Sequence, residues 1–118
     1  MKGILVVAHG SRAKETEAVM ETVLAMAKAK LPGCVIECAF MEFSDRTVEK
    51  GVAALVAQGV TDIKFVPYFL FMGNHLKLDI PEMIAECTEQ FPGISITLGE
   101  VLGADERLAD ALVDRIKG

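Results

Sequence analysis

The sequence predicts one α/β domain over residues 1–118, built on a four-stranded parallel sheet with helices on both faces. Strand-like and helix-like segments alternate four times along the chain. The strand-like segments are continuous apolar runs, which is typical of strands buried on both faces. Each connection between strands is long enough to contain a helix, so right-handed parallel crossovers are expected. These three observations indicate an architecture close to the flavodoxin-like class.

The first half of the chain contains two strand–helix pairs. Gly3–Ala8 is the first predicted strand, and the helix Arg12–Lys30 follows it and ends at Pro32-Gly33. Val35–Met41 is the second strand and Asp45–Gln58 the second helix. The apolar faces expected to be buried are Val19, Val23, Met26 and Ala27 in the first helix and Val48, Val52, Leu55 and Val56 in the second.

The second half repeats this order. Ile63–Phe71 is the third predicted strand, and Leu78–Gln90 is a less regular helix that Pro92-Gly93 ends. The last pair is the strand Ile94–Leu98 and the helix Asp105–Lys117, whose first residue can serve as its N-cap. The apolar stripe of this last helix consists of Leu108, Leu112 and Ile116.

Composition and charge exclude several classes of protein. The apolar fraction is 52%, which is high for a chain of this length and favours burial of some surface against a second subunit. No apolar run approaches the ~20 residues that span a bilayer, so no membrane association is expected. The chain enters its first strand at once, which leaves no room for a signal peptide and predicts a cytoplasmic protein. A net charge of −5 without a basic block makes nucleic acid an unexpected partner.

The three cysteines do not form a disulfide framework. Cys34 and Cys38 lie four residues apart on a predicted strand, which separates them by roughly 13 Å. That distance is too long for a disulfide or a shared metal ion. Cys87 falls inside a predicted helix, where it is expected to be a small buried apolar residue.

Candidate chemistry gathers where three consecutive strands end. His9 follows the first strand, Glu42 ends the second and His75 follows the third. The carboxyl ends of parallel strands share one edge of a sheet, where ligands bind. Two imidazoles and a carboxylate there can form an open site for Co²⁺, Fe²⁺, Ni²⁺ or Zn²⁺, or can move protons. The alternatives are histidines bonded to nearby backbone or solvated in a loop, and a glutamate that only favours a helix N-terminus.

Basic residues lie close in sequence to these candidates. Ser11, which can cap the first helix, and Arg12 form a generic anion cradle at its start. The segment lacks the glycine spacing of a nucleotide-binding fingerprint, so no nucleotide cofactor is expected. Arg46 and Lys77 extend the positive charge and suit an anionic ligand, although exposed lysines are usually only solvated. Phe71 and Met72 are the best candidates for an apolar ligand surface or a subunit contact.

The motifs together resemble one family. The stretches Leu5-Val6-Val7-Ala8-His9-Gly10-Ser11-Arg12, Ala39-Phe40-Met41-Glu42-Phe43 and Val66–Pro81, which includes Gly73-Asn74-His75 and Asp79-Ile80-Pro81, are similar to those of the class II tetrapyrrole chelatases. The best match is to short sirohydrochlorin cobaltochelatases of the anaerobic cobalamin pathway. The resemblance covers the whole chain and its length.

This resemblance implies more than the residues alone do. It implies insertion of a divalent metal, most of all Co²⁺ and otherwise Fe²⁺ or Ni²⁺, into sirohydrochlorin without ATP, which is a lyase-class reaction. The metal-binding histidines map to His9 and His75, and the acidic residue to Glu42. The anionic tetrapyrrole gives a role to Ser11, Arg12, Arg46, Gly73 and Lys77. Larger chelatases have two such lobes around a cleft, so a chain with one lobe is expected to form a homodimer.

Two other functions fit parts of the pattern. Histidine phosphatases also place a His-Gly pair after the first strand, but they need an arginine directly before that histidine, where this chain has Ala8. A metal or tetrapyrrole carrier would have the same site without turnover. A carrier is expected to hold cobalt tightly in the absence of substrate, whereas a chelatase is expected to bind it loosely.

Overall fold

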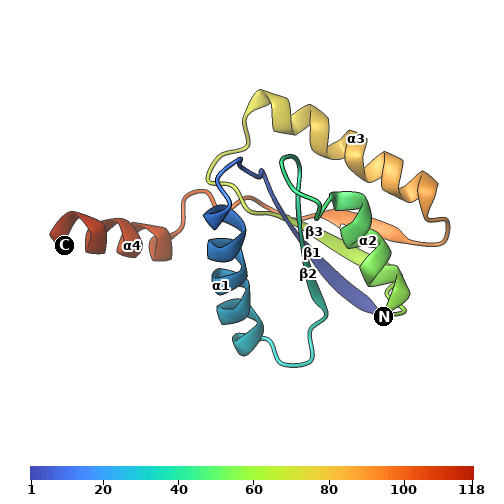
Figure 1. The fold of residues 1–118 in the computed structure, drawn as a ribbon, viewed down its shortest axis with the longest axis horizontal. Helices are drawn as coiled ribbons and strands as arrows, with labels where there is room; N and C mark the ends of the chain where they lie inside the picture. Colours follow the sequence, from blue (N-terminus) through green and yellow to red (C-terminus); the bar gives the residue numbers. More distant parts are fainter.

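The computed structural model describes residues 1–74 and 76–118 (Figure 1). Strands and helices alternate along the chain, as the sequence predicts. Their order is β1 (Lys2–Ala8), α1 (Glu15–Lys30), β2 (Ile36–Phe40), α2 (Val48–Ala57), β3 (Asp62–Pro67), α3 (Asn74–Gln90), β4 (Ser95–Leu98) and α4 (Glu106–Lys117).

The four strands form one parallel sheet in the order β2-β1-β3-β4. Val6 of the central strand β1 pairs with Cys38 of β2 on one side and with Val66 of β3 on the other. The chain leaves β1 toward β2 and then crosses to the opposite side for β3. The direction of winding therefore changes beside β1, and such a switch point opens a crevice at the carboxyl ends of the strands.

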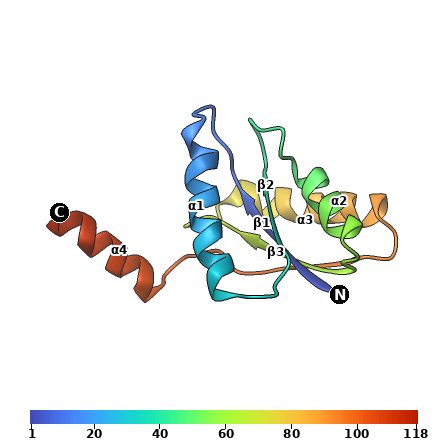
Figure 2. The same cartoon turned by 60° about the horizontal axis from the view of Figure 1, so that its bottom comes forward.

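Helices cover both faces of the sheet, which confirms the predicted fold class. α1 lies on one face, and α2 and α3 lie on the other (Figures 1 and 2). The core under α2 and α3 includes the fully buried Leu5, Val52 and Phe65. The smaller core under α1 joins Met20 and Leu24 to residues of β1 and β2.

The third strand is shorter than predicted. The sequence pattern extends it to Phe71, but it ends at Pro67. The reason is the length of its neighbour, because β1 ends at Ala8 and its pairing with β3 stops at Val7 opposite Pro67. The apolar residues that follow therefore form the connection to α3 and contribute to the surface, where Phe71 is 81% exposed.

Three helices begin at other residues than predicted. α2 begins at Val48, three residues after the predicted Asp45, and the Thr47 side chain caps it by accepting from the Lys50 N–H. α1 begins at Glu15, and the Ser11 hydroxyl accepts a hydrogen bond from the Ala13 N–H, so Ser11 supports a turn before the helix and does not cap it. α3 begins at Asn74, four residues before the predicted start, and contains Pro81. Proline in a helix leaves the carbonyl four residues earlier without its partner. That carbonyl belongs to an exposed residue, where water can satisfy it.

The apolar faces of the first and last helices also differ from the prediction. Met20 and Leu24 are the buried residues of α1, whereas Val19 and Met26 of the predicted stripe are 60% and 61% exposed. α4 has the predicted cap, since Asp105 accepts from the Arg107 N–H, but none of its residues is buried. Figures 1 and 2 show that α4 stands apart from the sheet. Among the described residues, no helix combines the length and apolar character needed to cross a bilayer.

The burial of the cysteines predicts their reactivity. Cys34 is exposed, whereas Cys38 and Cys87 are buried. Burial disfavours the thiolate and raises the pKa of Cys38 to about 11, and it raises the pKa of Cys87 as well. Since the thiolate is the reactive form, we expect one fast-reacting thiol in the native protein at pH 8 and two more after unfolding in urea. A thiol titration measures this, and rapid reaction of a Cys34→Ser variant would contradict it.

Candidate functional site

The ends of β1 and β2 approach each other closely at the carboxyl edge of the sheet. The Met41 N–H donates to the Ala8 carbonyl over 2.9 Å, and the Glu42 N–H donates to the His9 carbonyl over 3.1 Å. Gly10 has a φ of 96°, and a Cβ at this position would lie 2.0 Å from the Glu42 carbonyl oxygen. Only glycine allows both this backbone conformation and this approach. Gly10 therefore brings His9 beside Glu42.

His9 and Glu42, two of the three predicted metal-binding residues, lie side by side at this edge. The His9 Nδ1 lies 3.3 Å from the Glu42 Oε1, with the side chains 59% and 48% exposed. The Phe69 ring lies edge to face with the imidazole, with ring centres 6.3 Å apart. The carboxylate and the aromatic ring therefore hold the imidazole from two sides, while the pair stays open to a ligand. An imidazole and a carboxylate at this distance can share a metal ion or pass a proton.

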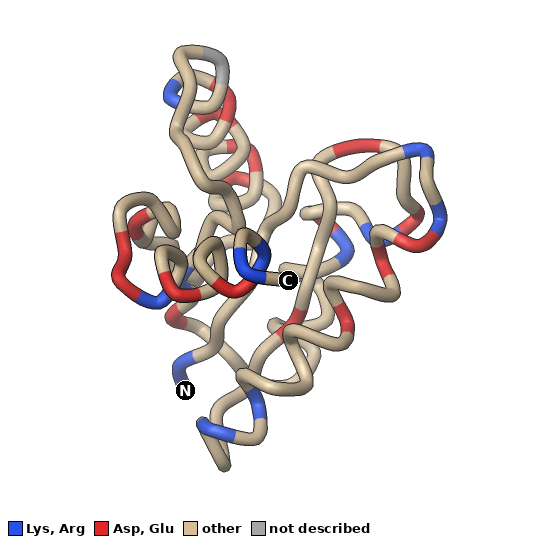
Figure 3. Tube along the Cα trace, turned by 90° about the vertical axis from the view of Figure 1, so that its left-hand side faces the viewer, with Lys and Arg blue, Asp and Glu red and all other residues tan. Residues whose placement is uncertain are grey.

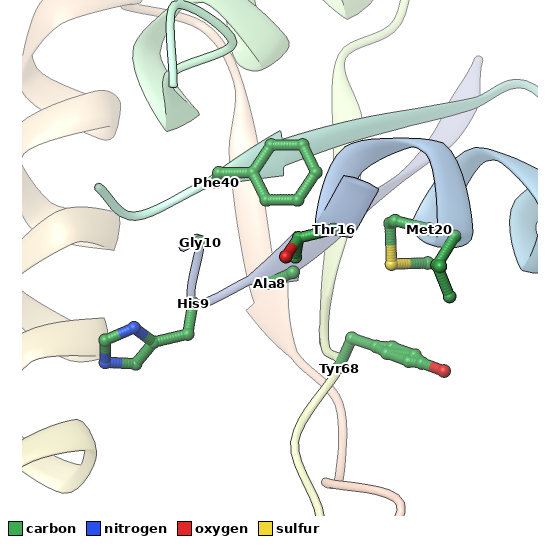
Figure 4. Close-up of a pocket in the computed structure, with 8 residues that line it drawn as sticks. Ala8, His9, Gly10, Thr16, Met20, Phe40 and Tyr68 are labelled. Atoms are coloured by element: carbon green, nitrogen blue, oxygen red, sulfur yellow. The ribbon is translucent and has the colours of Figure 1, made fainter. Parts of the chain in front are cut away.

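A shallow pocket of about 250 Å³ begins at His9 and extends toward α1. Figure 4 shows the imidazole at one end of this pocket and Met20 and Tyr68 at the other. Its other lining residues are Ala8, Gly10, Thr16, Val19 and Phe40. Since most of these side chains are apolar, the pocket suits the flat apolar part of a ligand whose reacting centre lies at His9.

A second, polar pocket of about 580 Å³ lies between the segments that follow β1 and β2. The Arg12 guanidinium lies over the Phe43 ring, 4.7 Å from its centre, and Ser11 and Lys14 also line the pocket. Phe43 has a φ of 59°, a left-handed conformation that is strained for a bulky residue. Such strain is typical of functional sites. The carboxylates Glu17 and Asp45 also line the pocket, so an anionic group would bind beside Arg12 and away from them.

No hydrogen bond or ion pair between the remaining predicted site residues and the side chains of His9 and Glu42 is seen in the described part of the chain. Arg46 pairs with Glu21 of α1 and lies 5.8 Å from the centre of the Phe40 ring, so its charge is already compensated within the protein. Gly73 precedes α3, and Lys77 is exposed on the first turns of that helix. His75 lies outside the described residues. Among those residues, no three His, Cys, Asp or Glu side chains are close enough to hold a metal ion.

Some features of the site are not evident from the sequence. The pattern indicates Phe43, Tyr68 and Phe69 as residues that could form an apolar wall and are mainly core, but not that Phe43 faces Arg12 and Phe69 faces His9. Thr16 lines the His9 pocket without any sequence signal. Their roles depend on where the chain turns after each strand, which the apolar pattern does not indicate.

The fold is that of a flavodoxin-like α/β protein, and the carboxyl ends of its strands carry the candidate site. The profile of the CbiX family matches residues 3–118, and the chain belongs to this family. The resemblance inferred from the motifs is thereby confirmed.

Relatives of two lengths match the chain. The sirohydrochlorin ferrochelatase of Priestia megaterium is 39% identical over 98% of this chain and 44% of its own length. The sirohydrochlorin cobaltochelatase of Methanococcoides burtonii is 37% identical over 96% of this chain and 92% of its own length. The crystal structure of the sirohydrochlorin chelatase SirB from Bacillus subtilis subspecies spizizenii in complex with cobalt matches with a TM-score of 0.90 at 39% identity, over 98% of this chain and 50% of that chain. The chain thus spans about half the length of the longer relatives.

Proposed function

We propose that this protein inserts a divalent metal ion, most of all Co²⁺, into sirohydrochlorin without a nucleotide. The observation that carries the proposal is the contact between the His9 Nδ1 and the Glu42 carboxylate at the carboxyl edge of the sheet, beside an apolar pocket. Membership of the CbiX family and the names of the relatives support it.

Insertion exchanges two pyrrole N–H protons for one divalent cation, which is a substrate here. The site must therefore hold the metal ion weakly after it loses water, and must accept the protons. A neutral imidazole and a carboxylate can do both. We assign metal binding to His9, Glu42 and His75, and proton acceptance to Glu42 or one of the histidines.

The substrate fits the two pockets in chemical terms. The ring of sirohydrochlorin is apolar and matches the pocket that begins at His9, while its peripheral carboxylates suit Arg12 and Ser11 in the polar pocket. We also assign Gly73 and Lys77 to this binding surface. Arg46 can bind a carboxylate of the substrate only if its ion pair with Glu21 breaks.

Cobalt is favoured over iron by the length of the relatives. The cobaltochelatase of M. burtonii matches this chain over 92% of its own length, whereas the ferrochelatase of P. megaterium does so over 44%. Solved structures of SirB with cobalt and with Fe³⁺ both match this chain, so the ions bound in them do not separate the two metals. Iron and nickel remain alternatives, because histidine and carboxylate ligands bind all three ions and affinity alone does not set the biological choice.

One copy of this chain supplies only half of the two-lobed arrangement that the resemblance implies for larger chelatases. Residues 1–118 supply one α/β lobe, and the chain covers about half of the longer relatives. We propose that a second copy of this chain supplies the other lobe in a homodimer that works in the cytoplasm.

The test is anaerobic incubation with sirohydrochlorin and Co²⁺, Fe²⁺ or Ni²⁺, followed by absorption spectroscopy. We expect insertion to be fastest with Co²⁺ and to fall by about 100-fold or more in both His9→Ala and His75→Ala, because each removes a proposed ligand. No acceleration over the protein-free reaction with any metal would refute the chelatase and favour a carrier. Near-normal turnover in either variant would remove that histidine from the mechanism.

A further inference from the structure

The last helix has an apolar face that its own chain leaves uncovered. Leu108, Leu112 and Ile116 recur every fourth residue of α4 and so lie on one face of it. Leu112 is 61% and Ile116 is 74% exposed, and the helix has no buried residue. Figures 1 and 2 show α4 separate from the sheet. An amphipathic helix of three turns is marginal unless its apolar face packs against something.

A matching surface lies on the α1 side of the sheet. Val19, Val23 and Met26 form an exposed apolar strip along α1. Beside this strip is a groove of about 200 Å³ whose lining, which includes Tyr68 and Leu102, is almost entirely apolar. In this topology α2 and α3 cover one face, while α1 is the helix drawn against the other (Figure 2). The groove therefore offers an apolar surface beside α1 on which a second helix can pack.

The charges at the ends of α1 and α4 indicate in which relative orientation the two helices would pack. α1 begins with Glu15 and Glu17 and ends with Lys28 and Lys30. α4 has the same polarity, with Glu106 in its first turn and Arg115 and Lys117 in its last; the basic end is blue beside the label C in Figure 3. An antiparallel pair places Glu15 and Glu17 near Arg115 and Lys117 and opposes the two helix dipoles, whereas a parallel pair aligns like charges and like dipoles, so charge favours the antiparallel arrangement.

The preferred antiparallel orientation is available between two copies of the chain but not within one copy. Every helix that follows a strand of this parallel sheet runs back from the carboxyl edge to the amino edge. If α4 folded back beside α1 of its own chain, it would therefore run parallel to α1, with Glu106 near Glu15 and Lys117 near Lys30. A helix from a second copy is free to approach in the antiparallel direction.

We propose that α4 of each copy packs antiparallel to α1 of a second copy, with Leu112 and Ile116 on the groove and strip of its partner. Both copies exchange their last helices in the same way, which gives a closed twofold interface. The inference specifies the interface of the homodimer proposed above, but it does not depend on chelatase activity.

The interface reaches the candidate site. α1 starts at the sheet edge that carries His9, and Val19 of its exposed strip also lines the His9 pocket. Antiparallel docking therefore brings the basic end of α4, with Arg115 and Lys117, to the edge of the partner copy's site. In this orientation Arg115 and Lys117 lie opposite Glu15 and Glu17, at the start of the partner copy's α1 and beside its His9 pocket.

Sedimentation of the wild-type chain and three single variants tests the apolar contact. We expect a wild-type dimer of twice 12.7 kDa, and a dissociation constant raised roughly 100-fold by Leu112→Glu or Ile116→Glu, since each places a charge in both copies of the interface. The control Ala111→Glu adds the same charge one turn from Arg107 and Asp114, on the polar side of α4, and is expected to stay dimeric. A monomeric wild type, or equal dimerisation of all four proteins, overturns the proposal.

Cross-linking tests the orientation independently of stability. In a Cys34→Ser background, copies with Val19→Cys are mixed with copies that carry Ile116→Cys and treated with a short bismaleimide. We expect efficient covalent dimers from this pair and few from Met26→Cys with Ile116→Cys, because Val19 and Met26 lie about 10 Å apart along α1. The reverse order, or cross-links only within single chains, overturns antiparallel exchange.

The two proposals fail in different ways. A dimer that gives the expected cross-links but does not insert metal supports the proposed interface and refutes the chelatase activity. A monomer that inserts cobalt supports the chelatase activity and refutes the proposed interface.

Discussion

Replacing Gly10 by alanine is expected to destabilise the protein by about 3 kcal/mol and to abolish most metal insertion. The added Cβ would lie 2.0 Å from the Glu42 carbonyl oxygen, which belongs to the backbone and cannot turn aside as a side chain can. The φ of 96° adds a further penalty. The ends of β1 and β2 must therefore separate by about 1 Å or more, and a displacement of this size at a reacting centre can cost about 100-fold in rate.

Gly33→Ala is the matched control. Gly33 also has a positive φ, of 84°, but a Cβ there would meet no atom within 4 Å. It should cost about 1 kcal/mol from the backbone conformation alone and leave insertion unchanged. Urea denaturation and the insertion assay measure both effects. If the two variants were equally stable and equally active, the close approach of Gly10 to Glu42 would not be essential.

Glu42→Gln is expected to slow metal insertion by about 100-fold while the fold stays intact. Glutamine keeps the size of the side chain and an oxygen near the His9 Nδ1, which lies 3.3 Å from the carboxylate. It loses the negative charge that attracts the metal ion and the basic oxygen that can accept a pyrrole proton. The partial exposure of both side chains makes a large effect on stability unexpected.

Two measurements separate these roles of Glu42. Calorimetric titration with Co²⁺ reports metal affinity, and single-turnover insertion with saturating metal reports proton removal. A weaker affinity with an unchanged single-turnover rate identifies Glu42 as a ligand, whereas the opposite result identifies it as a base. Glu89→Gln, at an exposed position near the end of α3, is the control for loss of one charge. If Glu42→Gln stays within about twofold of the wild type in both measurements, Glu42 has no direct role.

The apolar runs and the turn residues between them are enough to predict the parallel sheet and the order of its elements. The chain alternates strand and helix at intervals that leave few arrangements for a right-handed crossover. The ends of strands are less predictable, because they depend on the neighbouring strand. Phe71 illustrates this point: its segment reads as strand, but β1 provides no partner beyond Val7 for the end of β3.

The sequence by itself determined which chemical groups reach the ligand edge, since His9 and Glu42 follow directly from the ends of two buried strands. Only the tertiary structure decided that these two side chains touch, because the contact depends on the absence of a Cβ at Gly10. The tertiary structure also decided which apolar helix faces remain exposed to solvent. Periodicity marks the stripes of α1 and α4 as apolar, but burial depends on what lies opposite each helix, and within one copy nothing buries Ile116.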